Sequence, residues 1–554
     1  MKLQKRTPVL NAQLLALPLL LAGAPAFAAP PDAGQMLKEV RPAPAQPAPE
    51  APTTRIEERA ATIPADGARI MVEGLRISGQ SVFSEAELLS LVSDGVGKEL
   101  TLADLNRLAA RITHYYRKHG YLVARAYLPA QGIRDGQVEI AVLEGRLGKV
   151  TVNNTVGLGD SALAPVSALT AGEVLRRNEL EGSLLPLADL PGVRVKSVLK
   201  PGESIGTSDL LVDVAPGRAV TGSVDFDTYG NRYTGDTRLG GSVYFNSPMK
   251  RGDQISLRLQ TSGAGLAYGL VGYQLPVGSH GTRVGAAWSQ MHYKLGKDFS
   301  VLNADGDATV GSVHVLHPFI RGRLMNLYGQ ARYETKRLVD RVGITATQTD
   351  KTLDNWTAGI NGDRTDAFGG GGTTSFALSY TAGKLGLDAT SQTIDAATAQ
   401  SSGRSGKTSA SFQRLQRLTE DTTLYFSYAG QWADKNLDSA EKFILGGAYG
   451  VRAYPQGEAA GDAGRLVTAE LRRRVNDNWQ LKGFYDDGRV DINRNPWTAV
   501  NNARHLSGAG IGATFGSGQL SVNLLAAWRT GDGGASTSDV DRIPRVWIEA
   551  VRYF

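Results

Sequence analysis

The chain has 554 residues, 66 of them Gly and none Cys, with a formal net charge of +6 at pH 7. Its length exceeds that of one ordinary domain, and the lack of Cys excludes disulfides, thiolate metal sites and Cys nucleophiles. Lys and Arg are scattered among Asp and Glu rather than clustered, which argues against a nucleic-acid-binding protein.

The first 28 residues have the pattern of a secretory signal peptide. Residues 1–6 are basic, residues 14–22 are apolar, and residues 26–28 read Ala-Phe-Ala, a small-x-small cleavage site. No later window holds 18 consecutive apolar residues, so no transmembrane helix is expected. An exported chain of this kind can still span a membrane as a closed β-barrel.

Residues 29–68 are dominated by Pro and Ala, a composition typical of an extended linker that builds no core. Within this linker, residues 32–40 could form a short helix with Met36, Leu37 and Val40 on one face. The residues alone leave open whether this patch is a helix or simply part of the linker.

Residues 69–145 are predicted to form a small α+β domain. A strand over 70–77 precedes a capping box at 84–87 and a second one at 101–104, which opens a longer helix ended by Gly120. Strands are predicted over 121–128 and 138–143. The order is therefore β-α-α-β-β.

Residues 146–217 repeat this plan more loosely. We predict a strand over 149–152, a mostly helical stretch over 171–185, and a hairpin of strands 193–199 and 209–214. An exposed strand edge on this second domain could bind an extended peptide through main-chain hydrogen bonds, or it could be scaffold alone.

Residues 218–554 are predicted to form an all-β transmembrane barrel. Apolar residues recur at every second position, as in Ile255, Leu257 and Leu259, which suits a wall with lipid outside and water inside. The segments number about 16, an even count typical of bacterial barrels. Connections are short at 476–477 and 516–517, and long at the following places: 295–307, 338–350, 385–402 and 531–543.

One connection, residues 434–463, is too long and too rich in Gly for a hairpin turn, and such loops are usually functional. Its candidate functional residues are Gly447, Val451, Arg452, Tyr454, Gly457, Gly461 and Asp462. A later strand carries Phe484, Asp486 and Gly488 on one face. If the loop folds back into the barrel, Arg452 and Asp486 can form a charge-assisted pair; otherwise they are two unrelated solvated charges.

These two motifs resemble the signature pair of two-partner secretion transporters, the haemolysin secretion/activation family. The family motifs read Val-Arg-Gly-Tyr/Phe on the loop and Phe-x-Asp-x-Gly on the strand; here Ala453 replaces the Gly. The small domains resemble polypeptide-transport-associated (POTRA) domains, and the barrel resembles that of the outer-membrane assembly-factor superfamily. The terminal Phe554 resembles the signal read by the barrel-insertion machinery, although Arg552 departs from it.

The resemblance implies two periplasmic POTRA domains, at 69–145 and 146–217, before a barrel at 218–554 in a Gram-negative outer membrane. It implies that the helix near residues 32–40 plugs the lumen. It also implies partners: outer-membrane lipid, the barrel-assembly machinery, and a large adhesin or haemolysin-like exoprotein with an N-terminal secretion domain. The transporter would recognise this exoprotein unfolded and secrete it through the barrel.

Three alternatives remain. An assembly factor of the same superfamily typically carries more periplasmic repeats than fit into 69–217. A passive porin lacks periplasmic domains and the loop motif. An enzyme is not expected, because no nucleophile constellation, phosphate loop or zinc motif is present. We expect no cofactor, no metal and no nucleic-acid partner.

Overall fold

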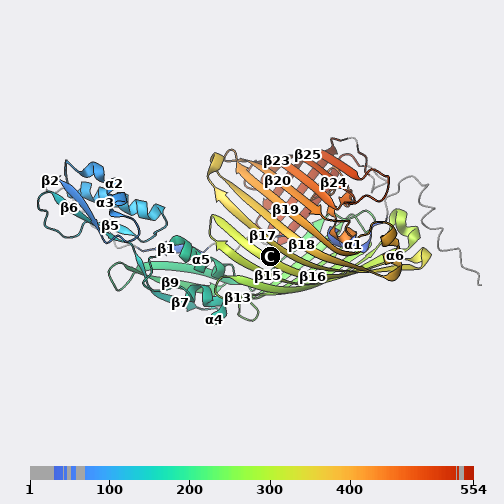
Figure 1. Cartoon of the computed structure of the whole chain (residues 1–554), viewed down its shortest axis with the longest axis horizontal. Coiled ribbons are helices and arrows are strands. Elements are labelled where there is room, and N and C mark those ends of the chain that lie inside the picture. The colour runs from blue at the N-terminus through green and yellow to red at the C-terminus, as the bar shows by residue number, and fades with distance from the viewer. Residues whose placement is uncertain (1–29, 41–42, 46–51, 58–68, 532, 536–541) are drawn as a thin grey trace, which may run out of the picture.

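The computed structural model describes residues 30–40, 43–45, 52–57, 69–531, 533–535 and 542–554. The signal-peptide prediction lies outside these residues. Two small domains stand in a row at one end of a large barrel (Figure 1). Among the described residues, no helix is both long and apolar enough to cross a membrane.

The first small domain packs two helices on a three-stranded sheet of order β3-β6-β5. Its elements are β2 (Ile70–Val72), β3 (Gly74–Ser78), α2 (Glu85–Ser90), β4 (Lys98–Leu100), α3 (Leu102–Lys118), β5 (Arg125–Tyr127) and β6 (Gln137–Leu143). Thr101 and Asp104 form a reciprocal capping box at the start of α3. From there α3 buries Leu105 and Ile112 in the domain core.

A buried carboxylate ties this domain together. Glu144 accepts hydrogen bonds from the backbone N–H groups of Ser81 and Val82, at 2.6 and 2.8 Å, and from the hydroxyl of Tyr116 at 3.0 Å. Burial alone would raise the pKa of Glu144, but these hydrogen bonds, led by those from Ser81, lower it below its ordinary value of 4.5.

Glu144→Ala should therefore destabilise the first domain by roughly 2–4 kcal/mol, because it leaves several buried donors without an acceptor. Urea unfolding of the purified 69–217 fragment measures this loss. Since the pKa of Glu144 is depressed by folding, its contribution is present above pH 4.5 and is lost as the pH falls through the folded value. An unchanged unfolding midpoint at pH 7 would contradict this role.

The second small domain has a sheet of order β1-β8-β9-β7. Its own elements are β7 (Arg146–Asn154), α4 (Asp160–Ser167), α5 (Arg177–Ala188), β8 (Val193–Pro201) and β9 (Thr207–Pro216). The fourth strand, β1 (Thr53–Ile56), comes from the Pro/Ala-rich linker and pairs parallel to β8. The linker strand therefore covers the β8 edge of this sheet, and β7 is the edge strand on its other side. In the first domain, the described residues place only β6 beside β5.

The predicted helix over 171–185 is wrong at its start, because α5 begins at Arg177. The preceding residues bond to the start of β7 instead: Leu147 N donates to Glu173 O at 2.8 Å, and Leu175 N donates to Gly145 O at 2.9 Å. These long-range backbone bonds compete with helix formation. Helix α4 was not predicted.

The barrel is closed and has sixteen strands, which confirms the predicted fold. They are β10 (Val220–Asp227), β11 (Arg238–Asn246), β12 (Gln254–Thr261), β13 (Leu266–Val277), β14 (Thr282–Lys294), β15 (Ala304–Arg321), β16 (Met325–Val342), β17 (Thr347–Asp366), β18 (Gly372–Leu387), β19 (Gly403–Arg417), β20 (Thr422–Ala433), β23 (Ala463–Arg474), β24 (Trp479–Asp491), β25 (Ala503–Ser517), β26 (Leu520–Arg529) and β27 (Arg545–Tyr553). Neighbours are antiparallel, and β27 closes on β10.

The two faces of the wall differ as the alternation predicts. On β12, Leu259 is 70% exposed to the outside, while Arg258 is 4% exposed and pairs with Asp225 inside, at 3.0 Å. The predicted long loop over 338–350 is wrong: β16 runs to Val342 and β17 starts at Thr347. A turn of only four residues, 343–346, joins them, because residues 338–342 and 347–351 continue the β16–β17 ladder up to the Val342–Thr347 pair.

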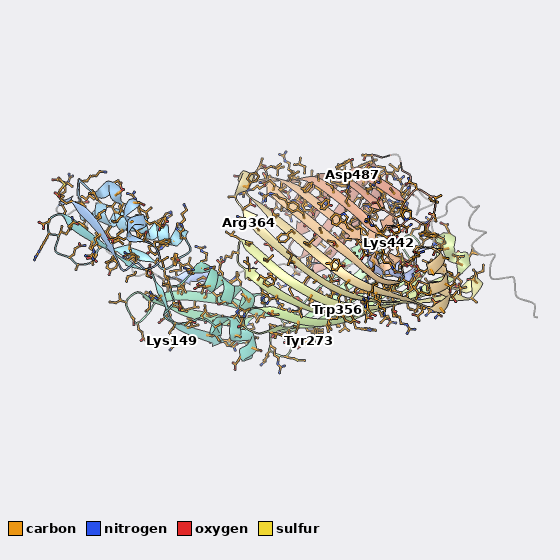
Figure 2. All side chains as sticks on the ribbon, in the orientation of Figure 1. Lys149, Tyr273, Trp356, Arg364, Lys442 and Asp487 are labelled. Atoms are coloured by element: carbon orange, nitrogen blue, oxygen red, sulfur yellow. The ribbon has the colours of Figure 1, made fainter. Side chains whose placement is uncertain are left out.

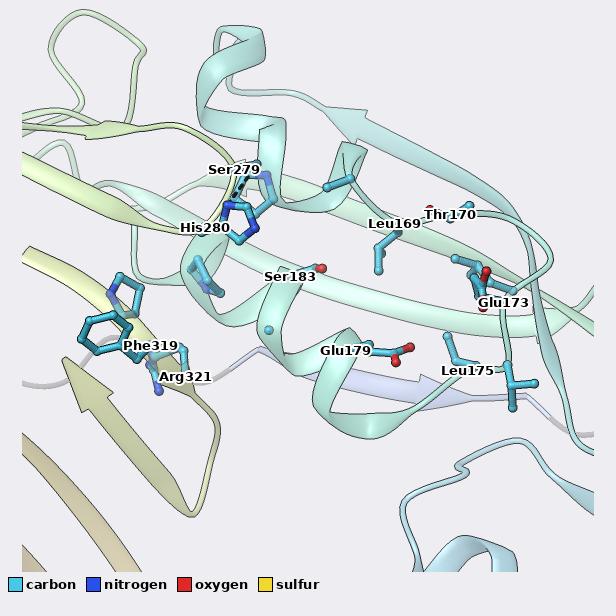
Figure 3. Close-up of a pocket in the computed structure, with 17 residues that line it drawn as sticks. Leu169, Thr170, Glu173, Leu175, Glu179, Ser183, Ser279, His280, Phe319 and Arg321 are labelled. Atoms are coloured by element: carbon cyan, nitrogen blue, oxygen red, sulfur yellow. Dashed lines mark hydrogen bonds between the residues drawn. The ribbon is translucent and has the colours of Figure 1, made fainter. Parts of the chain in front are cut away.

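The second domain is fixed to one rim of the barrel. The Asp189 carboxylate receives two hydrogen bonds of 2.7 Å from the guanidinium of Arg321, at the end of β15. A cavity of about 550 Å³ lies at this junction, between Glu179 and Ser183 on α5 and Ser279 and His280 on a barrel turn (Figure 3). The turns on this rim are short, and the opposite rim carries α6 (Ala389–Ala397) and the longer loops (Figure 1).

Candidate functional site in the barrel lumen

The loop over 434–463 joins the eleventh and twelfth barrel strands, β20 and β23. It holds the short helix η5 (Ser439–Glu441) and a small ladder of β21 (Phe443–Ile444) with β22 (Ala460–Gly461). Several of its side chains are fully buried, so the loop, hereafter the pore loop, folds back into the barrel instead of projecting from it.

Arg452 at the tip of the pore loop is bound to Asp486 on β24. Its Nε lies 2.8 Å from one carboxylate oxygen of Asp486 and its Nη2 lies 2.7 Å from the other, a bidentate pair. The backbone N–H of Arg452 also donates to Asp486, at 3.1 Å. Arg452 is 6% exposed and Asp486 0%, so removing one partner would leave a buried charge, at a cost of about 3–5 kcal/mol.

The structure adds partners that sequence reasoning missed. Glu470 on β23 receives the Nη1 of Arg452 at 2.5 Å, and the hydroxyl of Thr468 donates to Asp486 at 2.9 Å. The ring of Phe484 lies 3.5 Å from the centre of the guanidinium. The alternation on β23 puts Thr468 and Glu470 on one face, but only the strand register, which pairs Thr468 with Asp486, brings them here.

Ala453 fits the pore loop without strain. It is not among the described residues with a positive φ, so the position does not need the conformational freedom of Gly. Its methyl group is accommodated opposite Gly508, where an added Cβ would lie 2.5 Å from the Cβ of Ala453. The departure from the family motif therefore leaves the backbone of the tip intact.

The remaining motif residues shape the loop or its base. Asp462, 0% exposed, accepts from the backbone N–H groups of Leu437 and Arg494 and pairs with Lys442 at 2.8 Å (Figure 2 labels Lys442). Gly447 and Gly457 have φ of 119° and 82°. The others lie as follows: Val451 and Tyr454 are 0% exposed, Gly461 ends β22, and Gly488 follows Asp486 on the lumenal face of β24.

The C-terminal residue lies at the seam of the barrel. Phe554 and Gly222 exchange two backbone hydrogen bonds, at 3.1 and 3.2 Å, beside the β10–β27 ladder. The Phe554 side chain is 45% exposed.

Helix α1 (Ala33–Glu39) lies inside the barrel, between the wall and the pore loop (Figure 1). The carboxylate of its N-cap, Asp32, receives Lys351 of β17 at 2.9 Å and the hydroxyl of Ser439 in the pore loop at 2.7 Å. At its other end, Arg238 donates to the carbonyl of Glu39 at 2.7 Å. Both ends of α1 are thus fixed by charged groups.

Burial shifts two adjacent groups of α1 in opposite directions. It raises the pKa of Glu39 to about 7, against the hydrogen bonds from Gln35 and Asn231. Burial, helped by the positive charges of Lys407 and Lys336, lowers the pKa of Lys38 to about 7. Docking of α1 should therefore weaken as the pH rises from 4.5 to about 7, where docking takes up a proton on Glu39. It should strengthen again as the pH rises from about 7 to 10.5, where docking releases the proton of Lys38.

Deleting residues 32–40 should raise the ion conductance of the barrel several-fold, because the deletion removes α1 from the lumen. Planar-bilayer recordings of the purified protein measure this. The control is the full-length chain carrying only Leu37→Ala, with the 69–145 domain intact. Its conductance should stay near that of the wild type. Equal conductance of the deletion variant and the wild type would show that α1 does not obstruct the pore.

A closed sixteen-stranded barrel with two small domains on one rim defines an outer-membrane protein transporter, and the sequence comparisons agree. Residues 70–145 match the POTRA domain, ShlB-type, and residues 206–515 match the haemolysin secretion/activation protein family ShlB/FhaC/HecB. The chain belongs to this family of two-partner secretion transporters. It is placed in the outer membrane, with its POTRA domains in the periplasm, so the rim that carries them is periplasmic.

Relatives support this assignment along most of the chain. The heme/hemopexin transporter protein HuxB of Haemophilus influenzae (strain 86-028NP) is 30% identical over 500 residues, covering 87% of this chain and 86% of the relative. The outer membrane transporter CdiB of Dickeya dadantii (strain 3937) is 24% identical, covering 82% of each chain.

Solved structures share the fold. CdiB from Escherichia coli matches with a TM-score of 0.67 at 21% identity, covering 90% of this chain and 93% of that one. BamA from Haemophilus ducreyi lacking POTRA domains 1–3 matches with a TM-score of 0.55 at 12% identity, covering 87% of this chain and 100% of that one. Within the described ranges, no three His, Asp or Glu side chains are grouped so that they could hold a metal ion.

Proposed function

We propose that this chain secretes a large exoprotein, an adhesin or haemolysin-like protein with an N-terminal secretion domain, that it receives unfolded in the periplasm. The observation that carries the proposal is the Arg452–Asp486 pair, which holds the pore loop inside the lumen although the surrounding ladder is complete without it. A loop held by a few buried ion pairs has a defined resting position and can take another once those pairs separate.

Capture would occur on the POTRA domains. The described residues leave β5 of the first domain paired on one side only, and an extended segment can add to such an edge through main-chain bonds. The exoprotein would then pass through the barrel once α1 leaves the lumen and the pore loop moves. Folding of the exoprotein outside the cell would make passage irreversible.

During biogenesis, we propose that the assembly machinery recognises the last strand through Phe554, and that outer-membrane lipid surrounds the apolar outer face. No catalytic role and no cofactor are part of the proposal. The motif residues of the pore loop and of β24 act by fixing one loop position.

The direct test is co-expression with the very large exported protein encoded by a neighbouring gene, followed by assay of the culture medium. Release that depends on this chain supports the proposal. The other candidate function, insertion of outer-membrane proteins, is favoured by the shared fold with BamA. Loss of several outer-membrane proteins on deletion of the gene, with no change in the medium, would select that candidate instead.

A further inference from the structure

A carboxylate of the pore loop is held by three donors from three strands of the barrel wall. Glu441 in η5 receives Lys336 of β16 at 2.7 Å, Lys407 of β19 at 2.6 Å and the amide of Asn355 of β17 at 2.8 Å. The donors converge on one point in the lumen from strands that are fixed by the barrel ladder. They therefore form a built site whose present occupant is the Glu441 side chain.

The occupant and the site belong to parts of the molecule that can separate. Glu441 lies on the pore loop, whereas Lys336, Lys407 and Asn355 lie on the wall. The side chains of Glu441, Lys336 and Lys407 are 10–16% exposed, so their charges are largely removed from water. If the loop moves, the wall keeps cations that have lost a partner, and such a state is costly unless another anion takes the place of Glu441.

Lys407 depends most on the occupant. The contacts described for its ammonium go to the carboxylate of Glu441 at 2.6 Å and to the backbone carbonyl of the same residue at 3.1 Å. Lys336 has a second acidic neighbour, Glu334 on its own strand, at 3.0 Å. Movement of the loop thus removes both described contacts of Lys407 and one of the two carboxylates beside Lys336.

A cavity of about 510 Å³ opens next to this site and is lined by an excess of positive charge. Its charged lining residues are Lys38, Arg332, Lys336, Lys407, Glu334 and Glu441. Residues 330, 332, 334 and 336 of β16 line it. Strand β16 runs from the periplasmic rim outward, and α1 packs further along it, so the cavity extends to the periplasmic side of α1. A chain entering from the periplasm meets this cavity before it meets the helix.

We propose that Lys336, Lys407 and Asn355 form a carboxylate-binding site of the pore, filled by Glu441 at rest and by Asp or Glu side chains of the translocating polypeptide once the pore loop has moved. The inference rests on the proposed secretion function. It adds that the lumen binds acidic side chains of the exoprotein during passage. Exchange of one carboxylate for another keeps the buried lysines paired while the channel is open.

The test uses planar-bilayer recordings of the full chain lacking residues 32–40, with and without Glu441→Ala, in a KCl gradient. Emptying the site should raise the chloride-to-potassium permeability ratio at least about twofold, because Lys336 and Lys407 then attract anions into the lumen. A short polyglutamate peptide added on the periplasmic side should block the emptied channel, and a polylysine peptide of equal length should not.

Adding Lys407→Gln to the Glu441→Ala channel should remove most of the chloride preference and of the polyglutamate block. Lys482→Gln is the matched control, since Lys482 is a lumenal lysine on β24 that bonds to Asn523 and does not line this cavity. Equal effects of the two lysine substitutions, or an unchanged permeability ratio after Glu441→Ala, would overturn the site. These recordings need no exoprotein, so a failed secretion assay would leave their outcome standing.

Discussion

Replacing Arg452 with Ala is expected to reduce secretion at least about tenfold while the barrel still inserts and keeps its heat resistance in detergent. The substitution leaves the Asp486 and Glu470 carboxylates buried without the cation that joins them. The tip of the pore loop then loses its resting position, because both the bidentate pair and the contact with Glu470 depend on the guanidinium. The wall survives, since its stability comes from the closed ladder of strands.

Two further variants sharpen this result. Arg452→Lys keeps the charge but cannot form the bidentate pair, so its secretion should lie between the two extremes. Arg364→Ala, on β17 near the periplasmic rim (Figure 2), removes an Arg from the same barrel outside this cluster and should secrete normally. The measurement is the amount of exoprotein in the medium relative to the folded barrel in the membrane. Wild-type secretion by Arg452→Ala would remove the pore loop from the mechanism.

Deleting residues 69–217 is expected to leave a barrel that inserts and secretes nothing. The strands of the barrel begin at Val220 and close with β27, so the deletion keeps the whole ladder and the terminal Phe554. Capture of an unfolded exoprotein needs a strand edge in the periplasm, and a closed barrel offers none. Immunoblots of the membrane and medium fractions check both halves of the prediction.

A matched control distinguishes loss of the POTRA domains from loss of the contact between the second POTRA domain and the barrel rim. Asp189→Ala breaks the bidentate contact with Arg321 but keeps both POTRA domains, so it should still bind the exoprotein and secrete a measurable fraction. Normal export by the isolated barrel would mean that the POTRA domains are not the receptor, and a simple channel would then be the better description.

The sequence predicts the barrel well because alternation is a local signal that persists over many residues. The capping box at Thr101 and the sixteen strands follow from spacing alone. The failures have a common cause in pairing between distant segments. Residues 171–176 bond to the start of β7, and residues 338–342 pair with 304–308 of β15 and 347–351 of β17 instead of forming a loop.

The candidate site, too, could be predicted only in part from the sequence. Arg452 and Asp486 are visible in the sequence as a loop residue and a strand residue of opposite charge. The carboxylate of Glu470 becomes a partner only through the register of β23 with β24. The three donors around Glu441 come from β16, β17 and β19, and their spacing along the chain does not predict that they converge on one carboxylate.

The placement of α1 means that one segment of the chain lies inside a ring formed by another segment of the same chain. The helix lies within a ring made by the C-terminal half of the same polypeptide, while β1, only 13 residues further on (40–52 lie between), is hydrogen-bonded to a domain outside the ring. The β10–β27 seam could close around a helix already in place, or the segment could enter the finished ring, either by its amino-terminal end or as a loop folded back on itself. A folded domain fused ahead of residue 29 would hinder entry into a finished ring but not closure of the seam around the helix, so such a fusion distinguishes the two routes.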